Sequence, residues 1–268
     1  MTAPALVMLT HGSNDPAASE VCHRLRYALQ TVRPNLEIQA AFIDQCPPSG
    51  PQVVAHLASR GVTEIVFVPL HISSVTEHHP VVTTLVSQMR QTHPELSLAL
   101  ASPLGPEAAL LNPLDDRLRS ALGMARATEI DGLVLLAEAP IGVRGLSMLS
   151  RRARQWGAHH RLPCILASDD PSTPSVAAAI ETLNAQGRRH IGVGSFYLCP
   201  NQQFESQAHI ALRGGAIAVS APIGIDDVVL DLILARYAFA AMELLDHDNL
   251  SAGANAEVPL IEAITAVA

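Results

Sequence analysis

The chain of 268 residues lacks several features that define whole classes of protein. Its mean hydropathy is +0.25, yet no apolar run reaches the roughly 18 to 20 residues of a membrane-spanning helix. The formal charge is −8 and no Lys/Arg block occurs, so the basic footprint of a nucleic-acid-binding protein is missing. The first residues also lack the basic segment of a secretory signal peptide. These absences predict a soluble cytoplasmic protein whose partners include neither membranes nor nucleic acids.

Cysteine and phosphate-binding motifs are also scarce. The four cysteines form no CxxC pair and are too few for a disulfide framework, which is typical of a reducing compartment. We expect them to be free thiols in the core or half-buried. Neither half of the chain has a GxGxxG or GxxxxGK[ST] motif after its first expected strand, which argues against a nucleotide-binding domain.

An internal repeat with an offset of about 126 residues is present. Residues 6–13 align with residues 133–140, and this alignment matches His11 with Glu138. That segment has an offset of 127, and the pairs that follow it are 126 positions apart: Asp44 with Asp170, Gly61 with Gly187, Ile65 with Ile191, His71 with Tyr197, and His78 with Phe204. One deletion then lowers the offset to 119, where residues 102–105 align with 221–224. We interpret the repeat as a tandem duplication in which only the first copy keeps histidines at the expected site.

Short apolar segments alternate with longer amphipathic segments throughout both halves. The expected strands are Leu6 to Leu9, Ile38 to Phe42, Ile65 to Val68, Leu96 to Ala101, Leu133 to Leu136, Cys164 to Ala167, Ile191 to Val193 and Ala216 to Val219. The expected helices of the first half are Ala17 to Val32, Gln52 to Ser59 and Val81 to Gln91. This alternation predicts an α/β protein with two similar domains, each a mostly parallel sheet flanked by helices.

The repeat also predicts where the domains begin and end. The first domain is expected at residues 1–122 and the second, degenerate copy at residues 130–250, with a linker within 121–131. Residues 251–268 form a predicted tail. Its apolar stretch, Val258 to Val267, is compatible with either a short helix or a strand.

Histidines follow two of the expected strands in the first half. His11 comes directly after the first strand, with Gly12 allowing a tight turn, and His78 follows the third strand through the loop at 69–77. Ligand crevices of parallel sheets lie at the carboxyl ends of the strands, so both imidazoles are expected in one crevice. Two imidazoles with a nearby carboxylate can hold a divalent metal ion. Glu77 is the candidate for that carboxylate or for a catalytic base.

The remaining histidines are interpreted as structural. His71 lies two residues past Pro69, which favours a packing role near the end of the strand. The others lie on expected helices or in surface loops, and they are His23, His56, His93, His159, His160, His190, His209 and His247.

Taken in order, several motifs resemble the sirohydrochlorin chelatase (CbiX/SirB) family over roughly residues 5 to 245. The segments that carry the resemblance are HGSNDP at 11–16, AFID at 41–44, VPL at 68–70, SPLG at 102–105, GSFYLCP at 194–200 and SAPIG at 220–224. The resemblance implies two chelatase-like domains and a lyase that inserts Fe2+ or Co2+ into sirohydrochlorin in sirohaem or cobalamin biosynthesis. Sirohydrochlorin is an acidic tetrapyrrole with eight carboxylates, and no organic cofactor is implied.

The resemblance assigns roles to individual residues. His11 matches the family's first metal-presenting histidine and His78 the second, with His79 as the alternative because the loop can slip by one position. Either histidine or Glu77 can accept a pyrrole proton. Ser13 and Arg144 are predicted to bind the tetrapyrrole.

The region around these residues has further features. Arg144 belongs to a cluster with Arg151, Arg152 and Arg154 that suits carboxylate recognition or, alternatively, forms a solvated helix face. Asn14 stands where the family commonly has Arg, which weakens a possible contact with a substrate carboxylate.

Some alternatives stay open at this stage. A metal or tetrapyrrole carrier without turnover is the competing function. The metal is not encoded by two histidines, and a more methylated precursor is an alternative substrate. Single-domain members of the family are expected to pair, so a duplicated chain is predicted to be a monomer that acts as a pseudo-dimer.

Overall fold

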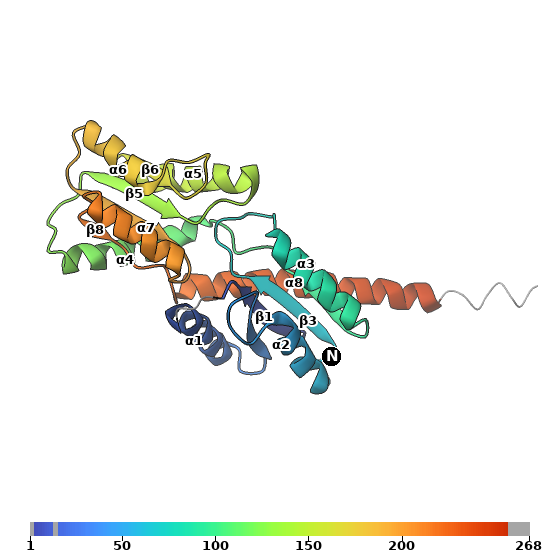
Figure 1. The fold of residues 1–268 in the computed structure, drawn as a ribbon. Helices are drawn as coiled ribbons and strands as arrows, with labels where there is room; N and C mark the ends of the chain where they lie inside the picture. The colour runs from blue at the N-terminus through green and yellow to red at the C-terminus, as the bar shows by residue number, and fades with distance from the viewer. Residues whose placement is uncertain (1–2, 13–15, 257–268) are drawn as a thin grey trace, which may run out of the picture.

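The computed structural model describes residues 3–12 and 16–256 and contains two four-stranded parallel sheets (Figure 1). The first sheet consists of β1 (Ala5–Thr10), β2 (Ile38–Phe42), β3 (Glu64–Pro69) and β4 (Ser97–Leu100). The second consists of β5 (Gly132–Ala137), β6 (Cys164–Ala167), β7 (Ile191–Phe196) and β8 (Ala218–Val219). The orders β2-β1-β3-β4 and β6-β5-β7-β8 are equivalent. The predicted α/β class with two similar domains is confirmed.

Helices flank both sheets. Those of the first half are α1 (Pro16–Val32), α2 (Gly50–Ser59), α3 (Pro80–Thr92), the short 3-10 helix η1 (Ala108–Leu110) and α4 (Leu111–Met124). Those of the second half are α5 (Gly142–His160), α6 (Val176–Ala185), α7 (Gln202–Arg213) and α8 (Asp227–Ala256). Their apolar residues recur at helical spacing, as in α3, where Val82, Val86 and Met89 are buried. Among the helices described, none combines the length and apolar character needed to cross a membrane.

The last helix of each half packs on the sheet of the other half. Helix α4 contacts β7 and β8, whereas α8 contacts β3 and β4 (Figure 1). Two arginines 119 positions apart hold the exchanged helices in equivalent ways. Arg117 in α4 donates to the carbonyl oxygen of Ile223, and Arg236 in α8 donates to that of Leu104. Since Ile223 and Leu104 are themselves 119 apart, the exchange is reciprocal.

The exchange bears on the predicted domain boundaries, which follow the sequence repeat. In space, α4 covers the second sheet although most of it precedes the predicted linker. Helix α8 runs past residue 250 to Ala256, so the predicted tail begins inside a helix. The apolar stretch Val258 to Val267 lies outside the described residues.

One hydrophobic core joins the two halves. Alternate strand residues face it from both sheets, including Leu6 and Met8 of β1 and Leu133 and Leu135 of β5. Residues of the opposite strand faces, such as Val7, pack instead in a separate core beneath the outer helices of their own half. A shared core fixes the position of one sheet relative to the other, and with it the crevice between their strand ends.

The four cysteines are free thiols, as predicted, and Cys22 is buried while the other three are half-buried. The sulfur atoms of Cys22 in α1 and Cys199 after β7 are 4.0 Å apart, so this pair bridges the two halves.

Candidate functional site

Three neighbouring strands of the first sheet bring His11, Asp44 and His71 together at their carboxyl ends. His11 follows β1, which lies between β2 and β3, so its loop is flanked by the loops that carry Asp44 and His71. Nδ1 of His11 lies 3.1 Å from Oδ2 of Asp44. A carboxylate on one ring nitrogen fixes the orientation and tautomer of an imidazole and leaves the other nitrogen to bind a ligand.

Gly12 allows the loops after β1 and β2 to approach each other. Its backbone N–H donates to Oδ1 of Asp44 over 2.8 Å. A Cβ at this position would overlap the carbonyl oxygen of Asp44 and lie 2.8 Å from the sulfur of Cys46. The glycine predicted for a tight turn is therefore also required by this close contact. Ser13, predicted to bind the tetrapyrrole, lies outside the described residues.

Two further imidazoles surround His11. The ring centroids of His71 and His79 each lie 5.4 Å from that of His11, in edge-on arrangements. His79 is the N-cap of α3, and its Nδ1 accepts a hydrogen bond from the backbone N–H of Val81 at 3.3 Å. Three imidazoles from the loops after β1 and β3 thus meet at one edge of the first sheet.

His71 is a buried, neutral member of this group. Its side chain has no hydrogen-bond partner at Nε2. Burial, together with the neighbouring histidines, lowers the pKa of His71 to about 4, so at neutral pH the ring carries no charge. A buried uncharged imidazole with a free lone pair is suited to bind a cation. The sequence predicted a packing role for His71. Its position two residues past Pro69 does not reveal that its ring lies beside that of His11.

His78 and Glu77, both predicted as site residues, are absent from the lining of the cleft that contains His11. His78 is half-buried, its Nδ1 has no hydrogen-bond partner, burial lowers its pKa, and it does not line the cleft. The side chain of Glu77 lies against Gly142 at the start of α5. The sequence left open whether His78 or His79 is the second metal ligand. In the structure the ring of His79 lies beside that of His11.

The second half contributes Glu138 to the same place. Glu138 follows β5 at the position that the repeat matches with His11, and both residues line one cleft. Burial raises the pKa of Glu138 to about 7. A carboxyl group with this pKa is partly ionised at neutral pH and can both accept and release a proton. The position that the repeat matches with His11 is therefore occupied by a carboxyl group of raised pKa in the second half.

The cleft lies between the two halves and has a volume of about 320 Å3. Its lining includes Thr10, His11, Asp44, His71 and His79 from the first half and Glu138, Ile141, Leu198 and Cys199 from the second. This volume is at the lower end of the range for small-molecule sites, roughly 300 to 1,000 Å3. A ligand as wide as a tetrapyrrole would therefore be enclosed only in part.

The arginine cluster is not part of the cleft lining. Arg144 is exposed in the first turn of α5, three positions after the lining residue Ile141. Arg152 is buried and donates to the carbonyl oxygen of Pro106 at 2.6 Å, which is a packing role. Arg151 and Arg154 are exposed further along the same helix.

Comparison with known proteins gives a family for the first half and a fold for the whole chain. Residues 5–121 match the CbiX family model. SirB from Bacillus subtilis with Fe3+ is 15% identical, with 89% of this chain and 96% of that chain covered and a TM-score of 0.69. The sirohydrochlorin chelatase SirB from Bacillus subtilis subspecies spizizenii in complex with cobalt is 14% identical, with 90% and 96% covered and a TM-score of 0.68.

A multi-domain protein from Deinococcus radiodurans, DR2241, is also similar. It is described as structurally similar to chelatases with two additional domains, and it is 17% identical, with 89% of this chain and 55% of that chain covered and a TM-score of 0.58. A search of the curated proteins gave no match. At these identities the structural likenesses show the fold, which is the two-domain chelatase fold expected from the sequence.

Proposed function

Because the chain belongs to the CbiX/SirB-like chelatase family through the match of its first half to the CbiX model, we propose that it is a sirohydrochlorin metal chelatase. It inserts Fe2+ or Co2+ into sirohydrochlorin, in sirohaem or cobalamin biosynthesis. The observation that carries this proposal is the convergence of His11, His71 and His79 with Asp44 and Glu138 on one cleft. The SirB relatives, one with Fe3+ and one in complex with cobalt, support the choice of metals.

In this proposal the first half presents the metal ion, which is a substrate. His11 and His79 are its ligands, with His71 behind them and Asp44 holding the ring of His11. His79 takes the role that the sequence gave first to His78, because the ring of His79 is the one next to His11. Imidazole nitrogens suit divalent first-row transition-metal ions such as Fe2+ and Co2+. The ring centroids of His11 and His79 are 5.4 Å apart, and we propose that the two rings bind one ion between them.

The second half accepts protons in this scheme. Insertion of a divalent metal ion releases two pyrrole protons, so a base of modest strength is needed within reach of the ring. Glu138 is the residue we assign to this role because its pKa is about 7 and it lines the cleft. The sequence left either histidine or Glu77 as the proton acceptor, and the side chain of Glu77 lies against Gly142.

The macrocycle is proposed to lie across the open cleft with its carboxylates outside. Arg144 in the first turn of α5 and Ser13 after β1 stay our candidates for contacts with those carboxylates. An arginine fork matches a carboxylate geometrically and would offset the net charge of −8 that otherwise repels an acidic substrate.

We also propose that the chain is a cytoplasmic monomer in which the two halves form a pseudo-dimer. The reciprocal contacts of Arg117 and Arg236 with the opposite half support this proposal. Size-exclusion chromatography with light scattering should give the mass of one chain, 28.4 kDa.

The proposed function is tested by an insertion assay. Purified protein is incubated anaerobically with sirohydrochlorin and Co2+ or Fe2+, and the absorbance of the macrocycle is followed against a protein-free blank. We expect many turnovers for each protein molecule. Formation of no more than one equivalent of metallated product would contradict the chelatase and favour the carrier.

A further inference from the structure

A second group of metal-binding side chains lies at the junction of α4 and α5. Asp115 comes from α4, and His159 and His160 are the last residues of α5. One ligand atom from each of the three lies within 4.8 Å of the others. In the part of the chain that the structure describes, this is the one group of three His, Cys, Asp or Glu residues that meets this distance. None of the three lines the chelatase cleft.

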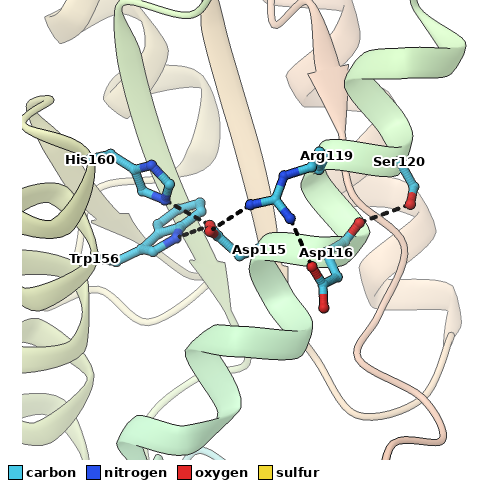
Figure 2. Close-up of polar contacts among 6 residues, drawn as sticks. All are labelled: Asp115, Asp116, Arg119, Ser120, Trp156 and His160. Carbon is cyan, nitrogen blue, oxygen red and sulfur yellow. Dashed lines mark hydrogen bonds and ion pairs between the residues drawn. The ribbon is translucent and has the colours of Figure 1, made fainter.

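The carboxylate of Asp115 is held in a fixed position. Its Oδ1 accepts a hydrogen bond from Nε1 of Trp156 at 2.8 Å and lies 2.7 Å from Nε2 of His160 (Figure 2). The side chain of Asp115 is only 16% exposed. Trp156 itself is buried against Gly194 of β7, so the indole is a rigid support. A donor on a ligand carboxylate is the usual outer-shell arrangement of a metal site.

The two histidines complete a set that opens to solvent. Their ring centroids are 4.9 Å apart and the rings are nearly perpendicular, at 86°. His159 is exposed and His160 is half-buried, so an ion can enter from the side of His159. Two imidazoles and one carboxylate suit borderline divalent ions such as Zn2+, Co2+ and Ni2+, whereas Mg2+ and Ca2+ prefer oxygen ligands.

The nearby positive charge of Arg119 does not block the site. Its Nη2 is 3.6 Å from Oδ2 of Asp115, but Nη1 makes a closer contact of 2.9 Å with Asp116 (Figure 2). The Arg119 side chain is 71% exposed and can therefore remain paired with Asp116 alone when a cation binds Asp115.

We propose that Asp115, His159 and His160 form a second site for a divalent transition-metal ion, with water in the fourth position. The site joins α4, which belongs to the first half of the sequence, to α5 of the second half. Ion binding therefore stabilises the packing of the exchanged helix on the second sheet. The sequence placed both histidines on a helix or in a surface loop, because Asp115 lies 45 positions from His160 and no local pattern links them.

The test is the stoichiometry of Zn2+ or Co2+ binding, measured by calorimetry without tetrapyrrole. We expect two metal ions per chain for the wild type and one each for His159→Ala and His11→Ala. The variant that combines both substitutions should bind no ion tightly. Loss of a direct ligand should weaken the second site about 10-fold or more. His209→Ala, an exposed histidine on α7, is the matched control and should keep two equivalents.

A second readout separates this site from the cleft. Saturating Zn2+ should raise the Tm of His11→Ala but not that of the double variant, because an ion that binds only the folded chain stabilises it. His159→Ala should keep full insertion activity. Two equivalents in His159→Ala would overturn this inference, whereas unchanged binding in His11→Ala would overturn the cleft assignment instead.

Discussion

The two halves of the molecule have the same strand order but differ in the residue that follows the first strand of each sheet. In the first half it is His11, beside two more imidazoles, and in the second it is Glu138, whose pKa is raised by burial to about 7. Both residues line the same cleft. The comparison shows that two sheets of the same strand order present different groups to one cleft, imidazoles from the first half and a carboxyl group from the second, and under the proposed function these groups divide metal binding and proton transfer.

This division depends on how the halves are joined. The shared core and the exchanged helices α4 and α8 hold the carboxyl ends of both sheets against one cleft. Without that junction His11 and Glu138 would serve separate crevices. A substitution in one half therefore tests whether the function of the other half depends on it.

The largest effect is expected for His11→Ala in the first half. Loss of this metal ligand should lower the insertion rate about 100-fold or more. The free energy of unfolding should hardly change, because the side chain is 40% exposed. Insertion kinetics and urea unfolding measure the two quantities. His56→Ala, an exposed histidine on α2, should keep wild-type activity, and equal rates for both variants would exclude His11 from the site.

Glu138→Gln in the second half should separate chemistry from metal binding. We expect kcat to fall about 100-fold because the proton acceptor is lost. The affinity for Co2+, measured without tetrapyrrole, should stay within a factor of about two because the imidazoles are untouched. A parallel loss of Co2+ affinity would mean that Glu138 is a metal ligand, and the two halves would then share one role.

The two halves should also respond to pH with opposite signs. The pKa of His71 is lowered to about 4 in the folded state. The contribution of the neutral ring to the free energy of unfolding is therefore complete above pH 6.5 and is lost as pH falls through 4. The pKa of Glu138 is raised to about 7. The contribution of its protonated carboxyl group to the free energy of unfolding is therefore complete below pH 4.5 and is lost as pH rises through 7. Over pH 4.5 to 6.5 the two contributions oppose each other.

Glu138→Gln removes one of these opposing contributions. Relative to the wild type, the variant should gain stability between pH 4.5 and 7, by up to about 3 kcal/mol. Urea unfolding of both proteins at several pH values measures this difference. A difference that stays constant with pH would show that the carboxyl group titrates normally.

The reciprocal helix contacts should contribute similarly to stability. Arg236→Leu leaves the carbonyl oxygens of Pro103 and Leu104 without their donor, and Arg117→Leu does the same for Ile223 and Ile225. Each should cost about 2 kcal/mol of unfolding free energy. Arg24→Leu, an exposed arginine on α1, should cost almost nothing. Arg236 also pairs with Glu107 over 2.7 Å, so its variant should cost slightly more, whereas a cost near zero for either variant would mean that its helix does not depend on the arginine.

The smallest effect is expected for Arg144→Ala. An exposed contact with a substrate carboxylate is worth under about 1 kcal/mol, so KM for the tetrapyrrole should rise about 3-fold with kcat unchanged. Arg154→Ala, on the same helix and also exposed, is the control. An unchanged KM for Arg144→Ala would mean that other residues bind the carboxylates of the tetrapyrrole.

Much of this arrangement could be predicted from sequence because it depends on local patterns. Apolar runs predicted the strands, and the repeat with its single deletion predicted two equivalent sheets. The match of His11 with Glu138 also followed from the repeat, although the carboxyl group was interpreted as a lost function. Only the burial of Glu138 in the cleft, which depends on tertiary packing, explains its raised pKa.

Other features depend on contacts that no local pattern records. His78 and His79 are adjacent in one loop, and the loop sequence did not reveal that His79, the N-cap of α3, is the one whose ring contacts His11. Asp44 was recognised as a repeat pair but not as the partner of His11. The exchange of α4 and α8 was not predictable either, because an amphipathic helix does not specify which of two similar sheets it covers.

The most direct test of the divided cleft is the ratio of insertion rates of wild type and Glu138→Gln as a function of pH. Taking the ratio cancels titration of the substrate and of the imidazoles. If Glu138 is the proton acceptor, the ratio should rise about tenfold between pH 6 and 8 as a group of pKa about 7 ionises. A ratio that does not change over this range would contradict the assignment of proton transfer to the second half.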